Sequence, residues 1–372
     1  MKVVFTGGGT GGHVSPNIAV ISELKKIAQK KDIDLDVLYI GRLFGIEKSM
    51  VRREGIRYMG VFSGKFRRYW DWRHLTDPFL VLLGFLQSFI ILSFYRPNVI
   101  FAKGGFVTVP VGIAGWILRI PLIIHESDAV LGLSNRILLR FASRVALGFP
   151  VDLYTGISVE KAFFAGNPVR EEIKEFELDK KGLCEKYGLD KQRPLLLILG
   201  GSQGAQRINE LIDSILEKLL QTYTVVHSVG EKGAAHFKER RARMFEKYKN
   251  NYIAFSFIRD EMGDFINNAD LIISRSGANA IAEIVSAHKP SILIPFPHAS
   301  ADHQNKNASF LQQEGIASVL EERHLNAFKL LEEIDYLVEN KKVREKMVEN
   351  MGDVFREDSA KKIVEKILEF NK

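Results

Sequence analysis

The chain has 372 residues, of which 46% are hydrophobic and 26% are charged. This composition excludes a disordered or fibrous protein, and the length predicts two domains rather than one core. The single cysteine, Cys184, excludes an intrachain disulfide and fits a reducing compartment. We expect no secretory signal, because Met1 and Lys2 lead directly into a short strand and a glycine loop.

The net charge is unevenly distributed. The whole chain has a net charge of +7, with +9 in residues 1–166 and −2 in the remainder. A basic half indicates an anionic partner, which could be a phosphate, a nucleic acid or an acidic lipid. A generically basic protein is the alternative. No nucleic-acid-binding motif is present, so we expect no nucleic acid partner.

Short apolar runs rich in β-branched residues alternate with longer helical segments. Each run has the length and composition of a buried parallel strand, and each intervening segment is long enough for a crossover helix. The runs lie at 2–7, 36–41, 99–105, 121–127, 144–149, 194–201, 224–230, 252–257, 271–277 and 291–296. This alternation predicts an α/β protein with doubly wound sheets that have helices on both faces.

The pattern begins again in the second half of the chain. A strand, glycine loop and helix occupy residues 2–24 and recur at 194–216. Two doubly wound domains in tandem explain the repeat, and Pro168 places the boundary near Gly166, because proline interrupts regular structure. We therefore expect domains at 1–166 and 167–352. The tail from Leu325 has the pattern of charged amphipathic helices with a break at Gly352, and we expect the last helix, 353–372, to pack on the first domain.

Residues 79–95 form the most apolar segment of the chain. A transmembrane helix is one interpretation of its length. We favour a helix held between the protein core and a bilayer surface, because a predicted strand of the same sheet follows almost at once. One face of this helix would present Phe79, Leu82, Leu83 and Leu86. Whether that face meets lipid or packs on the sheet is left open by the sequence.

The preceding segment, residues 65–73, combines basic and aromatic side chains. Arginines near anionic lipid are attracted to it, and tryptophan favours the membrane interface. The predicted membrane contacts in this segment are Arg67, Arg68, Trp70 and Trp72.

Three glycine-containing turns follow predicted strands. Residues 7–13 contain the spacing Gly-x-Gly-x-x-Gly at the start of a helix, where backbone amides can approach a phosphate. A dinucleotide site would also need an acidic residue at the end of the second strand, where this chain has Gly41 and Arg42. The spacing therefore favours phosphate binding without favouring a dehydrogenase. Residues 200–205 form a second such turn, for which a purely structural role is the alternative.

The third turn, residues 274–279, lies between a strand and a helix. Glu283 follows Asn279 by one helical turn and could accept both hydroxyls of a ribose, although an exposed helical glutamate is the alternative. The later segment 297–305 contains histidine, glutamine and asparagine, which can bind sugar hydroxyls. A metal site at Asp302 and its neighbouring histidines is disfavoured because no cysteine lies nearby. We expect no metal.

Two further loops end strands in the first half. Residues 103–106 and 125–128 each follow a predicted strand, at the end where ligands bind in open α/β sheets. Together with the first glycine turn they should line one edge of the N-terminal sheet.

A set of motifs in this order resembles the MurG family of glycosyltransferases. The matching segments are GGTGGH at 8–13, KGGF at 103–106, HES at 125–127, GNPVR at 166–170, GGSQGA at 200–205, SRSGAN at 274–279 with Glu283, and DHQNKNA at 302–308. They span nearly the whole chain. One loop departs from the pattern, since Glu126-Ser127-Asp128 stands where some relatives have Glu-Gln-Asn.

The resemblance implies a GT-B fold, in which two Rossmann-like domains face a cleft. It implies transfer of N-acetylglucosamine from UDP-GlcNAc to the C4 hydroxyl of undecaprenyl-linked N-acetylmuramoyl pentapeptide, the step from lipid I to lipid II in peptidoglycan synthesis. No cofactor is implied, because UDP-GlcNAc is a substrate. The alternatives are a UDP-sugar-dependent glycolipid synthase and a UDP-sugar epimerase of the same fold.

The resemblance also assigns roles to individual residues. Toward the donor it implies Thr10, Gly11, Gly12, Asp128, Arg170, Ser202, Gln203, the Ile258 backbone, Ala278, Asn279, Glu283, His303 and Gln304. Toward the acceptor it implies Gly8, Gly9, Gly104, Gly105, His125 and Glu126. The C-terminal domain would hold the UDP-sugar, and the N-terminal glycine loops would face the acceptor pyrophosphate.

In the inverting reaction that the resemblance implies, one displacement forms the new bond while UDP leaves. His13 is the candidate general base, since histidine titrates near neutral pH, and Asp128 is the rival. A His13 that only hydrogen-bonds the acceptor is the alternative. The implied location is the cytoplasmic face of the plasma (inner) membrane, where a peripheral enzyme would meet an anionic surface and other cell-wall synthesis proteins.

Overall fold

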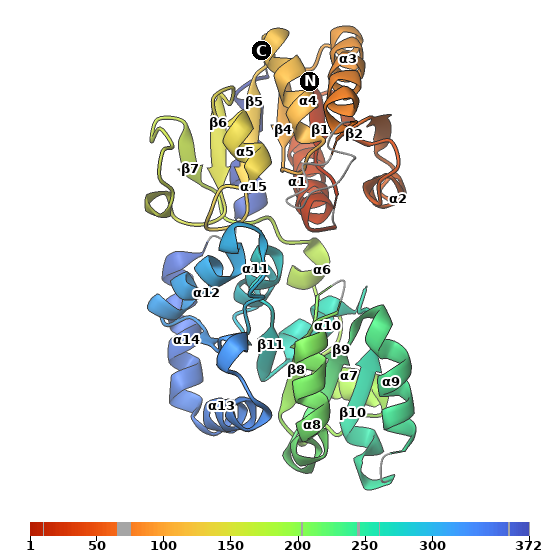
Figure 1. Cartoon of the computed structure of the whole chain (residues 1–372), viewed down its shortest axis with the longest axis vertical. Coiled ribbons are helices and arrows are strands. Elements are labelled where there is room, and N and C mark those ends of the chain that lie inside the picture. The colour runs from red at the N-terminus through yellow and green to blue at the C-terminus, as the bar shows by residue number, and fades with distance from the viewer. Residues whose placement is uncertain are drawn as a thin grey trace. The chain divides into compact units, whose positions relative to one another are not determined.

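The computed structural model describes residues 1–9, 11–64, 76–201, 204–243, 246–259, 261–355 and 358–371. The chain divides into two compact units (Figure 1). The first unit comprises residues 1–170 and 356–372, and the second comprises residues 171–355.

In the described part of the first unit, seven parallel strands form one sheet in the order β3-β2-β1-β4-β5-β6-β7. The strands are β1 (Lys2–Thr6), β2 (Asp36–Arg42), β3 (Arg57–Val61), β4 (Val99–Ala102), β5 (Leu122–Glu126), β6 (Arg144–Leu147) and β7 (Ala162–Phe164). The helices are α1 (Gly11–Lys30), α2 (Glu47–Arg53), α3 (Asp77–Tyr95), α4 (Thr108–Ile117), α5 (Leu133–Leu138) and α15 (Ser359–Leu368), with a 3-10 turn at Val151–Leu153. The central strands are fully buried, as expected for Val- and Ile-rich parallel strands with helices on both faces.

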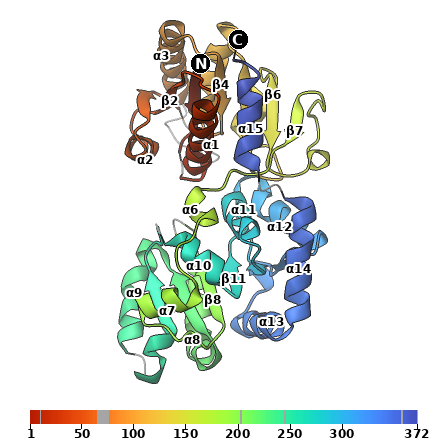
Figure 2. The ribbon, with the colours of Figure 1, turned by 180° about the vertical axis from the view of Figure 1, so that it is seen from behind.

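The C-terminal helix belongs to the first unit. Figure 2 shows α15 beside α1 on one face of the sheet, while α4 and α5 lie on the other face in Figure 1. Ile363, Val364 and Ile367 of α15 join the buried cluster that includes Val20 and Leu24 of α1. The end of the chain therefore completes the hydrophobic core of its beginning.

The second unit contains, in its described residues, six parallel strands in the order β10-β9-β8-β11-β12-β13. The strands are β8 (Leu195–Leu199), β9 (Thr224–Ser228), β10 (Tyr252–Phe255), β11 (Leu271–Ser274), β12 (Ser291–Leu293) and β13 (Ser318–Val319). The helices are α6 (Glu171–Lys174), α7 (Lys180–Tyr187), α8 (Gln206–Thr222), α9 (Gly230–Ala242), α10 (Met262–Asn268), α11 (Ala278–Ser286), α12 (His303–Gln313), α13 (Ala327–Glu339) and α14 (Lys341–Val354), with 3-10 turns at Glu246–Asn251, Ser300–Asp302 and Glu322–His324.

The unit boundaries lie a few residues later than the predicted 166 and 352. The Gly166 carbonyl lies 2.9 Å from Nε2 of His125, and the Asn167 side chain donates to the Ser127 carbonyl at 2.9 Å. These bonds attach Gly166 and Asn167 to the first unit. The predicted break at Gly352 is wrong, because α14 continues through this exposed glycine to Val354. A glycine near a helix end costs only about 1 kcal/mol, which the rest of the helix can offset.

The face of α3 that packs inward includes two small residues, Gly84 and Ser88. Gly84, Ser88 and Leu92 are buried at a spacing of four, and a Cβ atom at Gly84 would lie 1.9 Å from the Phe62 carbonyl oxygen. The predicted apolar face is exposed instead, with 69% of Phe79, 55% of Leu82, 46% of Leu83 and 48% of Leu86 accessible. The alternative in which this face packs on the sheet is therefore wrong.

Within the described residues, α3 is also the one helix long and apolar enough to cross a membrane, with a mean hydropathy of 1.9 in its most apolar window. However, α3 connects β3 to β4, which lie in the same sheet, and it contacts both α4 and β3. Its place as a crossover helix on the sheet argues against a transmembrane span and leaves its outer face free to meet a surface.

We expect Gly84→Ala to destabilise the first unit by about 1–3 kcal/mol, because the new methyl group overlaps the Phe62 carbonyl. The midpoint of thermal unfolding measures the effect, and Leu86→Ala on the exposed face is the matched control with little expected change. Equal midpoints for Gly84→Ala and wild type would contradict the inward orientation of Gly84.

Candidate functional site

The three loops predicted at the edge of the N-terminal sheet follow adjacent strands. β4 pairs with both β1 and β5, so the loops after these strands emerge side by side at the carboxyl edge. The backbones of two loops are in contact, because a Cβ at Gly105 would lie 2.2 Å from the Gly8 carbonyl oxygen. Gly104 and Gly105 also have φ values of 100° and 89°, which side chains other than glycine rarely adopt.

His13 lies at the junction of these loops. A Cβ at Gly104 would lie 3.6 Å from Nε2 of His13 and 3.8 Å from Nδ2 of Asn135. Desolvation and the positive charge of Lys103 lower the pKa of His13 to about 4, while Asp128 and a hydrogen bond to the Gly8 backbone raise it. The ring is therefore neutral at pH 7, which is the form that can accept a proton.

Glu126 organises the loop after β5. One of its carboxylate oxygens accepts hydrogen bonds from the backbone amides of Ser127 at 2.9 Å and Asp128 at 3.2 Å. The other accepts from the Gly132 amide at 2.7 Å and from the Asn135 side chain at 2.9 Å. Desolvation and Asp128 raise the pKa of Glu126. With four donors on its two oxygens, this buried carboxylate positions the loop.

His125 is fully buried behind the same loop. Its Nε2 atom lies 2.9 Å from the Gly166 carbonyl oxygen, so this nitrogen donates. Desolvation and Lys103 lower the pKa of His125 well below its usual value. Both side chains have internal hydrogen-bond partners, and the predicted contacts of His125 and Glu126 with the acceptor stay predictions. Sequence spacing places them at the edge of the sheet, but it does not show their burial.

Lys103 and Asn135 were not predicted as site residues. Lys103 is 2% exposed at the end of β4 and its ammonium group donates to the Ser127 hydroxyl. Asn135 of α5 donates to the His125 carbonyl at 3.0 Å as well as to Glu126. A lysine directly after a buried strand, inside the KGGF segment, is the signal that could have identified the first of them.

The second unit presents its glycine turns at the equivalent edge. β8 and β11 are neighbours, so the turn at 200–205 and the turn at 274–279 emerge side by side. Gly204 has a φ of 75°, and a Cβ there would lie 2.7 Å from the Val229 carbonyl oxygen. This close approach of two backbone segments is enough to require a glycine at position 204, whether or not a ligand binds there. Ser202 and Gln203, predicted to bind the donor, lie outside the described residues.

The turn after β11 is fastened to α12. Ser276 donates to the Gln304 carbonyl at 2.8 Å, and Asn307 donates to the Ser276 carbonyl at 3.1 Å. The Gln304 side chain accepts from the Phe296 amide at 2.9 Å. These bonds hold the turn before α11 and the start of α12 together.

The remaining predicted donor residues are placed as follows. Ala278 is buried in the first turn of α11, and Asn279 and Glu283 are half-buried on the same helix. His303 begins α12, and its Nδ1 atom lies 2.7 Å from the Ser300 carbonyl oxygen. Ile258 is buried after β10.

Other predicted residues lie in the first unit or outside the description. Gly8 is buried, Gly9 is exposed, and Gly11 and Gly12 open α1. Arg170 ends the first of the two segments that form the first unit, although the prediction placed it in the donor domain. Asp128 is half-buried in the loop that Glu126 organises. Thr10, Arg67, Arg68, Trp70 and Trp72 lie outside the described residues, so their roles stay predictions.

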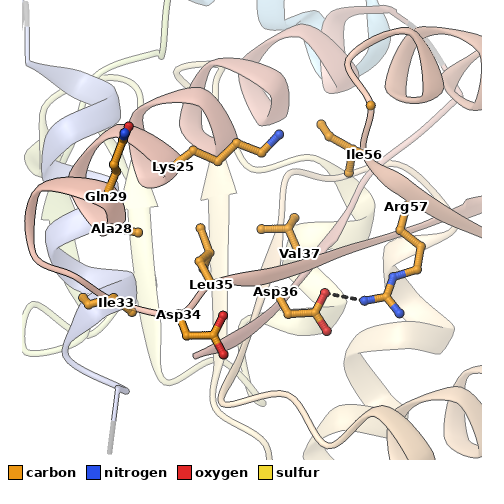
Figure 3. Close-up of a pocket in the computed structure, with 11 residues that line it drawn as sticks. Lys25, Ala28, Gln29, Ile33, Asp34, Leu35, Asp36, Val37, Ile56 and Arg57 are labelled. Carbon is orange, nitrogen blue, oxygen red and sulfur yellow. Dashed lines mark hydrogen bonds and ion pairs between the residues drawn. The ribbon is translucent and has the colours of Figure 1, made fainter.

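A pocket in the first unit lies away from these loops. Figure 3 shows it at the amino ends of β2 and β3, where Asp36 pairs with Arg57 beside Lys25 and Leu35. Ligands in open parallel sheets bind at the carboxyl ends of the strands. This pocket is therefore separate from the candidate site. Over the described residues, no three His, Cys, Asp or Glu side chains gather as metal ligands would.

Two tandem doubly wound units with glycine turns at the carboxyl edges of their sheets are the domain composition of the GT-B fold. Residues 3–147 match the glycosyltransferase family 28 N-terminal domain, and residues 195–367 match the family 28 C-terminal domain. The chain belongs to glycosyltransferase family 28 and, within it, to the MurG family, as its motifs predicted.

Two curated relatives match over most of their length. The chain is 40% identical to UDP-N-acetylglucosamine–N-acetylmuramyl-(pentapeptide) pyrophosphoryl-undecaprenol N-acetylglucosamine transferase 2 of Bacillus cereus, covering 91% of this chain and 92% of the relative. It is 37% identical to the transferase of that name, without the number, from Clostridium botulinum, covering 100% of this chain and 99% of the relative.

Solved structures confirm the predicted fold. MurG of Acinetobacter baumannii matches with a TM-score of 0.75 at 24% identity, covering 99% of each chain. UDP-GlcNAc 2-epimerase of Neisseria meningitidis matches with a TM-score of 0.70 at 15% identity, covering 99% of this chain and 100% of that one. At these identities the similarity shows the fold alone. An epimerase and a transferase share it, so the fold does not choose between them.

Proposed function

We propose that this enzyme transfers N-acetylglucosamine from UDP-GlcNAc to the C4 hydroxyl of undecaprenyl-linked N-acetylmuramoyl pentapeptide, which converts lipid I to lipid II. The observation that supports this best is the 37–40% identity to transferases of that name across both domains. An isolated nucleotide-binding domain would match over only one half. The proposed reaction uses no resident cofactor, because UDP-GlcNAc is itself a substrate.

The proposed chemistry is a single displacement. The C4 hydroxyl oxygen of the acceptor forms a bond to the anomeric carbon, and the bond from that carbon to the UDP oxygen breaks with inversion. The hydroxyl proton passes to neutral His13, and the electron pair leaves with UDP. Backbone amides at the start of α11, near Ala278 and Asn279, would stabilise the charge on the leaving pyrophosphate, because a helix N-terminus favours negative charge.

The proposed binding roles follow the two sheet edges. In the first unit Gly8, Gly9, Gly104 and Gly105 offer backbone groups to the acceptor, with Asp128 beside them. In the second unit Glu283 accepts the ribose hydroxyls, and His303 and Gln304 lie toward the sugar. The bonds from Ser276 to Gln304 and from Asn307 to Ser276 support this grouping, since they keep the two helix starts together.

The direct test is incubation with radiolabelled UDP-GlcNAc and the lipid-linked muramyl acceptor. Labelled lipid-linked disaccharide is the expected product. Label on diacylglycerol instead would indicate a glycolipid synthase, and a changed sugar on UDP without any acceptor would indicate an epimerase. Either of those outcomes, with no labelled disaccharide, would contradict the proposed function.

Membrane association is implied for a family whose members are named for an undecaprenol-linked substrate. We propose that the outer face of α3 docks on the cytoplasmic face of the plasma membrane. Ile90 and Phe94 extend the exposed row that begins at Phe79, and Trp116 and Ile117 of the adjacent α4 are also exposed. The sequence contains no Asp or Glu between residues 78 and 125. Such an apolar surface without acidic residues suits an anionic bilayer.

We expect the triple variant Leu82→Gln, Leu83→Gln and Leu86→Gln to bind anionic vesicles at least tenfold more weakly, because the apolar side chains no longer enter the acyl boundary. Transfer to vesicle-embedded acceptor should fall, while transfer to a short-chain soluble acceptor stays near wild type. Replacing Arg67, Arg68, Trp70 and Trp72 together should have the same effect.

The matched control is Phe328→Gln with Tyr336→Gln, because these α13 side chains are similarly exposed on the second unit. It should bind vesicles as wild type does. Retained vesicle binding by the triple variant, or an equal loss of activity on both acceptors, would refute α3 as the docking surface.

A further inference from the structure

We propose that Lys103 is a positioning residue for the transfer reaction, which holds the loop of Asp128 against the end of β4 and places a positive charge beside the His13 ring. The inference rests on the proposed function, in which His13 or Asp128 receives the acceptor proton. It assigns a role to a buried lysine that the reaction scheme above does not use.

The first support is the position of Lys103. It follows β4, which lies between β1 and β5, so it lies between the turn that leads into α1, where His13 is the third residue, and the loop that contains Asp128. It is 2% exposed, and a buried ammonium group is costly unless it is paired and hydrogen-bonded. Ser127 supplies the hydrogen bond, and Glu126 and Asp128 supply the opposite charge.

The second support is the way the Asp128 loop is held. The Ser127 carbonyl accepts from Asn167 at 2.9 Å, and the Asp128 carbonyl accepts from the Tyr154 hydroxyl at 2.7 Å. Glu126 binds the amides of the same two residues. The Ser127 side chain is bound by Lys103. Lys103 is thus the contact that joins this loop to the strand beside His13.

The third support is the set of charges around His13. Lys103 lowers the pKa of His13, and Asp128 raises it. Two other helices pack against α1. The α15 residues in the shared core, Ile363, Val364 and Ile367, are uncharged, whereas α2 contributes the Glu47 carboxylate, which lies against Gly8. Lys103 is therefore a cation that opposes protonation of His13.

Lys103 is itself charged in the working pH range. Desolvation lowers its pKa to about 8, with Glu126 and Asp128 acting in the opposite direction. At pH 7 most of the ammonium groups are therefore protonated, and the positive charge is present beside His13. Because His13 lies near both Lys103 and Asp128, removal of the lysine charge alone should shift the balance toward the protonated ring.

The test compares Lys103→Met, which removes the charge, with Lys103→Arg, which keeps it. The ring of His13 is titrated by NMR in protein labelled at histidine, with the His13→Ala variant assigning the resonance. We expect Lys103→Met to raise the pKa of His13 by about one unit and to move the acid limb of the kcat profile upward with it. Lys103→Arg keeps the positive charge, so the acid limb of its kcat profile should stay at the wild-type pH. Lys30→Met is the matched control, because Lys30 is the last residue of α1, the helix that contains His13.

Ser127→Ala separates the two parts of the proposal. It removes the hydrogen bond but keeps the charge, so kcat should fall about three- to tenfold with little change in His13 titration. This variant also serves if Lys103→Met does not fold. An unchanged His13 titration in folded Lys103→Met, or an unchanged kcat in Ser127→Ala, overturns the proposal. The titration needs no turnover, so an absence of transfer by the wild type would contradict the proposed function separately.

Discussion

His13→Ala is expected to lower kcat by about 10²–10⁴-fold and to leave the KM for UDP-GlcNAc within about twofold of wild type. This expectation follows from the proposed role of His13 as the base that takes the proton of the acceptor hydroxyl, and its ring lies beside Gly104 at the junction of the N-terminal loops. The ribose and sugar contacts of the proposed donor site are made by other residues, on α11 and α12. Steady-state kinetics with each substrate varied in turn measures both constants.

The pH dependence should identify the group that acts. The pKa of about 4 for His13 means that the ring is neutral above that pH and becomes protonated below it. If neutral His13 is the base, activity should persist down to pH 5 and decline toward pH 4, instead of declining near 6.5. The anionic substrates would raise the pKa and move this limb upward.

Two variants complete the experiment on His13. His324→Ala, at an exposed histidine of the second unit, should leave kcat unchanged. Asp128→Asn tests the rival base, since it keeps the shape of the side chain and removes its basicity. If His13→Ala costs less than tenfold while Asp128→Asn costs more than a hundredfold, Asp128 is the base and the role proposed for His13 is wrong.

Glu283→Ala is expected to raise the KM for UDP-GlcNAc by about 5–150-fold, which corresponds to about 1–3 kcal/mol for hydrogen bonds to a charged group. Glu283 is half-buried on α11, one turn after Asn279 and close to the start of the helix. A carboxylate in that place can accept two ribose hydroxyls while the helix amides face the phosphates. Initial rates at saturating acceptor and varied donor provide the measurement.

Glu283→Gln should give an intermediate KM, because the amide retains one acceptor oxygen. Glu345→Ala, at an exposed glutamate of α14, is the control for a helical glutamate without a ligand role, and its KM should equal that of wild type. A folded Glu283→Ala protein with unchanged donor KM would show that this carboxylate does not bind the ribose.

Much of the fold could be predicted from local patterns. The buried strands were visible as apolar runs, and the glycine turns were visible because a close backbone approach or a positive φ requires glycine. The short strands β3, β7 and β13 were missed. Most residues of β3 are exposed or half-buried, and β7 and β13 have only three and two residues, so none of them has the continuous apolar run that identifies a central strand.

The candidate site was only partly predictable for a different reason. Sequence spacing placed His125 and Glu126 at the edge of the sheet, yet their side chains are used inside the domain, on the Gly166 carbonyl and on the loop amides. Lys103 was visible in its motif, but its bond to Ser127 joins residues 24 positions apart. Such contacts depend on which strands become neighbours, and no local pattern contains that information.

By itself the sequence determined the alternation of strands and helices, the repeat of the nucleotide-binding pattern and the family. These features depend on local periodicity and on backbone conformations that particular residues permit. Only the tertiary structure decided which face of α3 is exposed, where the units end, and which polar groups surround His13. Gly84 illustrates the physical reason. A glycine can occur on any face of a helix, and only the position of the Phe62 carbonyl shows that the face with Gly84 packs inward.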